Sequence, residues 1–274
     1  MSTDVAGAPA THASVPITIG GTEGTWDIAA EVPVQVTVNG APFTVMLATP
    51  ADLEDLARGL LLTEQVLTRP DGIERLDVTG WLGDLQIAVH ITPEALRTER
   101  LGARSVLGNS GCGACGVESL AQLHGRRPVS REACINVSDD AVLRGLREMP
   151  AHQPLNATSH SVHAAAWCDM SGEVLLVRED VGRHNALDKL VGALAEANRL
   201  HEPGFVVMSS RCSYELVYKT SVTNAQLLAT ISAPTTMALQ WSTALGVPLA
   251  STLRRGDRFE VVRFPVSSLK FSTE

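Results

Sequence analysis

The amino-acid sequence predicts an α/β (α+β) protein, with a mixed sheet and flanking helices in its C-terminal part and a smaller α+β unit before it. Two patterns support this prediction. Between residues 20 and 100, strands of alternating apolar residues surround one helix, whereas from residue 138 onward short apolar strands alternate with helices. Strands separated by helices form parallel or mixed sheets, because parallel neighbours need a crossover connection.

The smaller unit begins with a hairpin and a helix. Apolar residues alternate over 34–47 around Asn39-Gly40, a strong signal for a type I′ turn. In the helix that follows, Thr49 is the expected cap, and Asp52 suits the positive end of the helix. Residues 85–91 alternate cleanly and predict a further strand.

The second half predicts helices and strands in turn. Ser138 is the expected cap of the first helix, and Asp188 and Lys189 are expected at the solvated start of the second. The predicted helices cover 138–149, 184–198, 213–222 and 234–246. The predicted strands cover 173–177, 205–210, 227–232, 247–251 and 259–264.

These patterns divide the chain into four segments. We expect a flexible N-terminal tail over 1–19, a small α+β domain over 20–107, a mobile cysteine loop over 108–116, and an α/β domain over 117–274. The tail has neither a basic nor an apolar region of the kind found in signal peptides.

Composition narrows the classes of function. The chain has 274 residues, of which 45% are hydrophobic and 19% charged, enough for a substantial core without disulfides. Its formal net charge of −8 argues against nucleic acid or an anionic membrane as a partner. No apolar run approaches the length of a membrane span, so none is expected. The odd number of cysteines, 5, favours reduced thiols in a cytoplasmic protein.

Cys112 and Cys115 lie in the glycine-rich stretch GNSGCGACGVESL, which allows several interpretations. A tetrahedral zinc site needs four ligands, and completing it would require Cys134, Cys168 or the histidines at 160 and 163. The zinc deaminase signature is absent, because Ala165 of HAAAW stands where its glutamate would be, and Trp167 is expected to pack on the sheet. A dithiol redox pair and a plain surface turn are further alternatives.

A sulfur carrier is the remaining interpretation. A carrier thiolate takes the terminal sulfur of a donor persulfide and hands it to an acceptor, so it must reach into two different protein sites. The glycines around Cys112 and Cys115 predict a flexible loop that could carry such a thiolate. The helix predicted to follow would favour the thiolate through its N-terminus.

Basic residues follow three of the predicted strands. They are Gly182-Arg183-His184, Arg211 and the segment LRRGDR over 253–258. Ligands bind at the carboxyl ends of strands in open α/β sheets, so these segments predict a shared anion pocket in an otherwise acidic protein.

In their order and combination, these segments resemble the formate dehydrogenase accessory sulfurtransferases, the FdhD family. The resemblance rests on GCGACGVESL, HAAAW, REDVGRHNALDKLVG, SSRCSYELVYK and the basic segment before FEVV. AAEVPVQVTVNG and LATPADLEDLARGLLLTEQV are similar to that family as well, so the resemblance spans roughly residues 28–265.

The resemblance implies a sulfurtransferase. FdhD proteins take sulfur from a cysteine desulfurase, carry it as a cysteine persulfide, and pass it to the molybdenum bis(guanine dinucleotide) cofactor of formate dehydrogenase. The persulfide cysteine of the family falls on Cys112, with Cys115 as its partner. The cofactor-contacting segment falls on Leu253, Arg254, Arg255, Gly256, Asp257 and Arg258. A cofactor-binding insertion chaperone without essential sulfur transfer is the alternative.

The resemblance also implies a cytidine-deaminase-like C-terminal domain and a homodimer, with no permanently bound cofactor. No metal is expected, because the cysteine pair supplies only two of the four ligands of a zinc site. The sequence departs from the family in two places. Thr252-Leu253 stands where the family often has Gly-Phe, and Cys212 stands where a small residue is expected. Arg254, Arg255 and Arg258 keep the positive charge that phosphate groups need.

Overall fold

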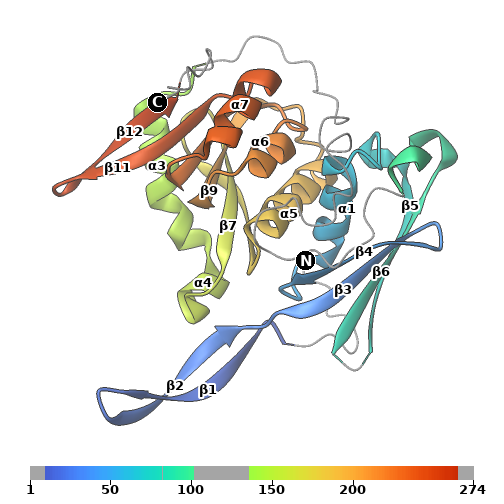
Figure 1. Ribbon diagram of the computed structural model, residues 1–274, viewed down its shortest axis with the longest axis horizontal. Helices are drawn as coiled ribbons and strands as arrows, with labels where there is room; N and C mark the ends of the chain where they lie inside the picture. The colour runs from blue at the N-terminus through green and yellow to red at the C-terminus, as the bar shows by residue number, and fades with distance from the viewer. Residues whose placement is uncertain (1–9, 82, 102–135, 265–274) are drawn as a thin grey trace, which may run out of the picture.

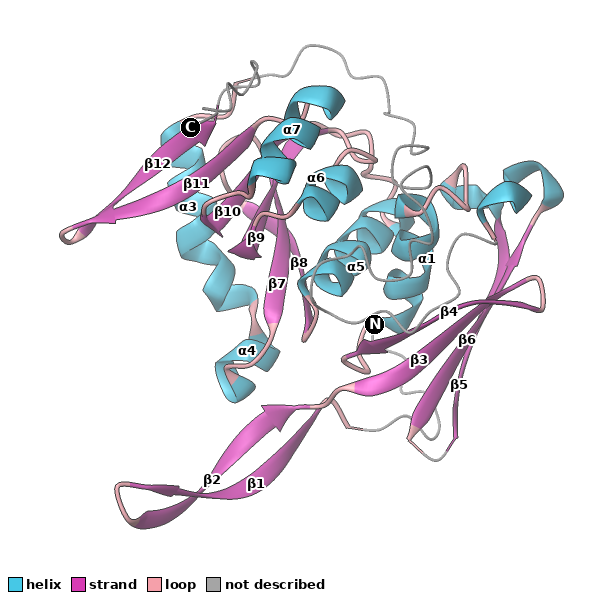
Figure 2. Cartoon of the chain, in the orientation of Figure 1, coloured by secondary structure: helices cyan, strands magenta, loops and turns pink. Residues whose placement is uncertain are grey.

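The structure is a computed structural model that describes residues 10–81, 83–101 and 136–264. Its strands form a larger sheet, a smaller sheet and a separate hairpin, with helices between and around the sheets (Figure 1; Figure 2). The helices are α1 (Leu53–Thr63), α3 (Asp139–Glu148), α4 (Pro154–Ser159), α5 (Arg183–Glu196), α6 (Tyr214–Thr220) and α7 (Thr236–Leu245). The strands are β1 (His12–Ile19), β2 (Thr22–Ala29), β3 (Val32–Val38), β4 (Ala41–Ala48), β5 (Ile73–Trp81), β6 (Asp84–Ile91), β7 (His163–Cys168), β8 (Val174–Asp180), β9 (Gly204–Arg211), β10 (Ala225–Ser232), β11 (Leu249–Arg255) and β12 (Arg258–Phe264).

The larger sheet has the strand order β12-β11-β10-β9-β7-β8. β10 pairs in parallel with β9 and β11, whereas β7 is antiparallel to β8 and β9, and β12 is antiparallel to β11. β8, β9, β10 and β11 therefore point the same way, and their carboxyl ends lie at one edge. The predicted mixed sheet is confirmed, while its likeness to cytidine deaminase stays a prediction.

Apolar side chains on both faces bury this sheet. On one face, Val206 of β9 and Leu228 of β10 belong to one buried cluster with residues of α1, α5 and α6. On the other face, Val207 of β9 packs in a second cluster with Val142 of α3. Trp167 of β7 is fully buried, which confirms its predicted packing on the sheet.

The smaller sheet has the order β4-β3-β6-β5, and α1 lies between it and α5 (Figure 1). The predicted hairpin is confirmed: Asn39 and Gly40 both have positive φ, 49° and 82°, as a type I′ turn requires. α1 and α5 approach each other through their backbones, since a Cβ atom added at Gly59 would lie 1.7 Å from the carbonyl oxygen of Asp188. The first buried cluster contains residues of both sheets, so the two units share one core.

The predicted N-terminal cap is confirmed for α3 but not for α1. The Ser138 hydroxyl accepts a hydrogen bond from the Ala141 amide at 3.1 Å, so the predicted cap of α3 is confirmed. The predicted cap Thr49 is wrong for α1, because the N-cap residue is Asp52, which has φ 50° and no side-chain capping bond. Thr49 instead bonds to the β8–α5 connection, where it contributes to the functional site.

The N-terminal segment and two strands differ from the sequence patterns. Residues 12–19, expected within the tail, form β1 and pair with β2 in a projecting hairpin. Trp26 of this hairpin donates a hydrogen bond to the Ser159 carbonyl of α4 at 3.4 Å. β5 and β7 are further strands that the patterns do not predict. The expected boundary between the small domain and the cysteine loop lies outside the described residues.

Candidate functional site

Polar side chains gather at the edge where the parallel strands of the larger sheet end. β8 leads into α5 through Gly182, with Arg183 and His184 in the first turn of the helix, and β9 leads into α6 through Arg211 and Ser213. β7 runs in the opposite direction between β8 and β9, so His163 at its start lies at the same edge. This edge is where open α/β sheets bind ligands.

The pKa of His163 is influenced by two of the basic segments, those that contain Arg183 and Arg211. Burial lowers the pKa of His163, and the positive charges of Arg183 and Arg211 lower it further, against an opposing effect of Asp180. The connections after β8 and β9 therefore place two guanidinium groups close enough to act on one imidazole through their charge. Such a setting favours a neutral imidazole and attracts anions.

The third basic segment, residues 253–258, does not form the predicted loop at the end of a strand. Leu253, Arg254 and Arg255 end β11 and Arg258 begins β12, with Gly256 and Asp257 in the turn between them. The prediction that the strand ends at residue 251 and continues as a loop is wrong, because the chain extends into a β-hairpin that projects from the sheet (Figure 1). β10 separates this hairpin from β9, so it adds a basic extension beside the cluster around His163.

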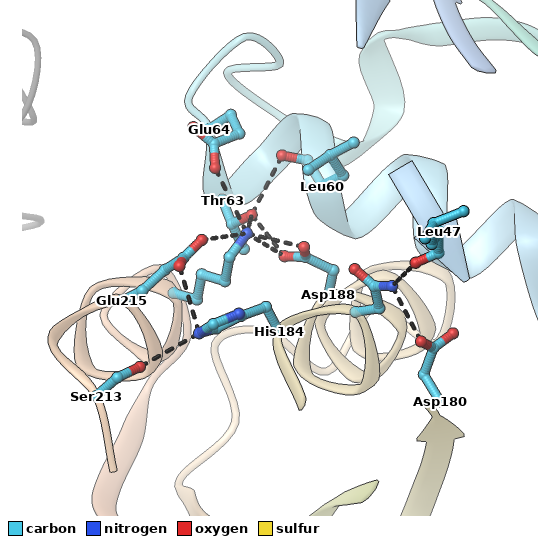
Figure 3. Close-up of polar contacts among 11 residues, drawn as sticks. Leu47, Leu60, Thr63, Glu64, Asp180, His184, Asp188, Ser213 and Glu215 are labelled. Carbon is cyan, nitrogen blue, oxygen red and sulfur yellow. Dashed lines mark hydrogen bonds and ion pairs between the residues drawn. The ribbon is translucent and has the colours of Figure 1, made fainter. Parts of the chain in front are cut away.

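A buried ion pair anchors the β8–α5 connection. Lys189 and Asp180 are both fully buried, with 2.7 Å between the Lys189 Nζ and an Asp180 oxygen. The same Asp180 carboxylate accepts hydrogen bonds from the amides of Thr49 and Gly182. Asn185 donates to Asp180 and to the Leu47 carbonyl (Figure 3). The expectation of a solvated Lys189 is wrong, because its charge holds the start of α5 to the segment before α1.

A second buried cluster joins α1, α5 and α6. The Lys219 Nζ donates to both carboxylate oxygens of Asp188 at 2.8 Å and to the Thr63 hydroxyl at 3.0 Å. Asp188 is 1% exposed, so its expected place on a solvated helix face is wrong. Burial raises the pKa of Asp188, and Lys219 opposes that effect.

This second cluster reaches the functional edge through His184. The His184 Nε2 atom lies 3.3 Å from a Glu215 oxygen and 3.2 Å from the Ser213 hydroxyl, and the other Glu215 oxygen lies 4.0 Å from the Lys219 Nζ (Figure 3). The chain of contacts fixes the His184 ring beside the basic edge. Sequence spacing does not reveal the contact between α1 and α5, because Thr63 and Asp188 lie 125 positions apart.

The two predicted carrier cysteines, Cys112 and Cys115, lie outside the described residues. Cys168 and Cys212 are buried free thiols, and burial raises the pKa of each to about 12. Cys168 and His163 stand at opposite ends of β7, about 16 Å apart along the strand, so they do not share a metal ion. Within the described ranges, no group of three or more potential ligands could hold one.

Cys168 and Cys212 are expected to resist alkylation in the native protein. A thiol with a pKa near 12 carries almost no thiolate at neutral pH, and burial keeps the reagent away. Brief treatment with iodoacetamide, followed by peptide mass mapping, should leave both residues unmodified. The same treatment in denaturant is the control, in which all 5 cysteines should react. Rapid native labelling of either buried thiol would contradict this arrangement.

A model of the FdhD/NarQ family matches residues 29–265. The chain belongs to this family. The matched range of the FdhD/NarQ model includes Cys112, Cys115, the edge around His163 and the β11–β12 hairpin, whereas all but the last residue of the β1–β2 hairpin precedes it. The predicted resemblance to the family is therefore confirmed.

Curated FdhD/NarQ relatives are similar over most of the chain. One is the sulfur carrier protein FdhD of Xanthomonas campestris pv. campestris (strain B100), 43% identical over 230 residues that cover 84% of this chain and 82% of the relative. Another is the sulfur carrier protein FdhD of Chromobacterium violaceum, 44% identical over 233 residues that cover 84% of this chain and 86% of the relative.

A solved structure supports the fold. The crystal structure described as a formate dehydrogenase accessory protein from Desulfotalea psychrophila matches 93% of this chain and 96% of its own, with a TM-score of 0.66 and 20% identity. At that identity the likeness concerns the fold alone. In the part of the chain that the structure describes, no helix is long and apolar enough to cross a membrane.

Proposed function

We propose that this FdhD/NarQ protein carries sulfur from a cysteine desulfurase to the molybdenum bis(guanine dinucleotide) cofactor on which formate dehydrogenase depends. The observation that carries the proposal is the family match over 29–265 together with relatives that are 43% identical and named sulfur carrier protein FdhD. Cys112 is the carrier and Cys115 its partner. The protein works in the cytoplasm, as a homodimer.

The loading step is a thiol–persulfide exchange. The Cys112 thiolate attacks the terminal sulfur of the desulfurase persulfide, a new S–S bond forms on Cys112, and the bond to the donor sulfur breaks. The donor cysteine leaves as a thiolate, so the step balances without an added oxidant or reductant. The thiolate, not the thiol, is the nucleophile, and the glycine-rich setting of Cys112 suits a group that must reach a second protein.

In this proposal the acceptor cofactor binds to basic residues of the larger sheet. The cofactor carries guanine dinucleotides whose phosphates are anionic, and the chain as a whole has a net charge of −8. Recognition therefore depends on local positive charge, which Leu253–Arg258 provide on the projecting hairpin and which Arg183 and Arg211 provide around His163. In this proposal Leu253, Gly256 and Asp257 contribute the shape of the hairpin end, and the three arginines contribute its charge.

The test is intact mass after incubation with a cysteine desulfurase and cysteine, with and without reductant. The wild-type chain and Cys115→Ala should gain one sulfur atom that the reductant removes. Cys112→Ala should gain none, and formate dehydrogenase in a strain with that variant should have only background activity. Normal formate dehydrogenase activity with Cys112→Ala would contradict the proposal.

The basic hairpin favours a second candidate, a chaperone that binds and inserts the molybdenum cofactor without essential sulfur transfer. That candidate predicts no sulfur gain on accessible thiols. It also predicts that replacing Arg254, Arg255 and Arg258 together blocks formate dehydrogenase maturation, whereas Cys112→Ala does not. The two candidates therefore differ most clearly in the outcome of the Cys112 substitution.

A further inference from the structure

We propose that the β1–β2 hairpin is a docking surface for the sulfur donor, and that it fits a donor surface on which lysine and arginine side chains surround an apolar patch. The inference rests on the proposed function, because the donor is the cysteine desulfurase of that proposal. It goes further by naming the part of this chain that the desulfurase contacts. All but the last residue of the hairpin precedes residue 29, where the family match begins, so the family resemblance assigns no role to it.

The hairpin projects from the body of the protein and is fixed to it beside α4 (Figure 1). The Trp26 indole N–H donates to the Ser159 carbonyl, and the Trp26 ring lies 5.7 Å from the His160 ring between centroids. The Ala29 amide donates to the Ser161 hydroxyl at 3.3 Å. Because these contacts fix the direction of the hairpin, it loses little conformational freedom when it binds a partner.

One face of the hairpin is apolar. The strand register places five apolar side chains on this face, namely Val15, Ile17, Ile19, Trp26 and Ile28. Ile19 is 63% exposed, Trp26 41% and Ile28 43%. Single exposed apolar side chains are common on protein surfaces, whereas a contiguous group of them marks an interaction site. The apolar face therefore indicates a protein partner.

The hairpin is also acidic. Glu23 and Asp27 lie on its other face, opposite Thr18 and Ser14, and Glu31 lies between β2 and β3. The hairpin contains neither lysine nor arginine. A surface of this charge attracts a basic partner surface and accelerates its association.

The charge of the hairpin distinguishes between the partners that the chain meets. The acceptor cofactor is anionic, so these carboxylates would repel it, and the proposed function places it on the basic residues of the larger sheet. An anionic membrane is repelled in the same way. Two copies joined hairpin to hairpin would bring like charges together. The desulfurase meets the chain without the anionic cofactor, so it is the partner that the hairpin fits best.

The experiment measures the affinity of the full chain for a purified cysteine desulfurase by biolayer interferometry, at low and at high salt. The double variant Ile19→Ser/Ile28→Ser should weaken binding about tenfold, because it removes apolar contacts from the docking surface. Glu23→Lys should weaken binding about fivefold at low salt and less at high salt, because salt screens exposed charges. Glu23 is exposed, so this second variant tests the hairpin even if the apolar variant misfolds.

Two matched controls change the same residue types outside the hairpin. Ile231→Ser replaces an isoleucine of β10 that is 45% exposed, and Glu94→Lys reverses an exposed charge that follows β6. Both should leave the affinity for the desulfurase within about twofold of the wild type. Thermal unfolding of each variant identifies any loss of affinity that comes from misfolding.

The outcomes separate this inference from the function on which it rests. Equal affinity of the wild type, the apolar variant and Glu23→Lys overturns the inference, as does an equal loss in the controls. A loss of self-association in the hairpin variants, with unchanged affinity for the desulfurase, assigns the hairpin to a second copy and overturns it too. If the wild-type chain does not bind the desulfurase, the inference fails, and the gain of sulfur on Cys112 then decides whether the proposed function fails with it.

Discussion

Replacing Gly59 by alanine is expected to destabilise the protein by about 3 kcal/mol or more. The added methyl would lie 1.7 Å from the Asp188 carbonyl oxygen and 2.8 Å from the Gly192 amide nitrogen. Both obstacles are backbone atoms of α5, so a side-chain rotation cannot relieve the clash and the two helices must separate. That separation opens the core between the smaller sheet and the larger one.

Denaturant unfolding of Gly59→Ala measures this effect. Gly24→Ala is the matched control, because a methyl group at that position meets only an Ile17 side-chain carbon at 3.9 Å. The control should change the free energy of unfolding by less than about 1 kcal/mol. Equal stability of Gly59→Ala and the wild type would show that α1 and α5 do not pack as closely as described.

Lys219→Met is expected to lower the free energy of unfolding by about 3–5 kcal/mol. Lys219 is 1% exposed and is bonded to both oxygens of Asp188, which is itself buried. Its removal leaves a buried carboxylate without its principal countercharge. The double variant Lys219→Met/Asp188→Asn removes both charges and should recover a large part of the loss.

The loss should depend on pH. Without Lys219, the pKa of Asp188 rises further above its unfolded value of about 4, since the lysine is the main influence that lowers it. A raised carboxyl pKa in the folded state favours folding at low pH, and that advantage disappears as the pH rises. The deficit of Lys219→Met should therefore grow between pH 4 and pH 7. Arg75→Met breaks an exposed ion pair with Asp77 and should cost less than about 1 kcal/mol at either pH.

The predicted elements are those with clean periodicity. β3 and β6 have alternating apolar residues, and α3 has both a capping serine and an apolar stripe. In β4 the register shift beside Val36 and Thr37 moves the buried positions from Phe43 to Met46 and Ala48.

β7 was not predicted because its residues are buried on both faces, which removes the alternation, and three of them are alanines. β5 contains a register shift between Ile73 and Arg75, and β1 contains Pro16, so neither shows a regular strand pattern.

For the edge around His163, the sequence predicts where two basic segments lie but not which side chains they contact. The basic residues after β8 and β9 are predicted at one edge, and the charges of Arg183 and Arg211 both act on His163. The buried cluster was missed because Glu215 and Lys219 are spaced four apart, as in exposed helix pairs, while Thr63 and Asp188 come from distant parts of the chain. Gly59 and Gly192, each in the middle of a helix, were the signal that could have revealed the close contact of α1 and α5.

The close crossing of α1 and α5 makes the protein a single cooperative folding unit. α1 contributes to the core of the smaller sheet on one side and meets α5 of the larger sheet on the other, with Thr63 bonded to Asp188 across the contact. Because each sheet packs against the helix that covers the other, we expect no stable half-folded form in which only one sheet keeps its packing. A ligand that binds only the native state of the larger sheet is therefore expected to slow amide hydrogen exchange in β3 and β6 as well, which lie on the far side of α1.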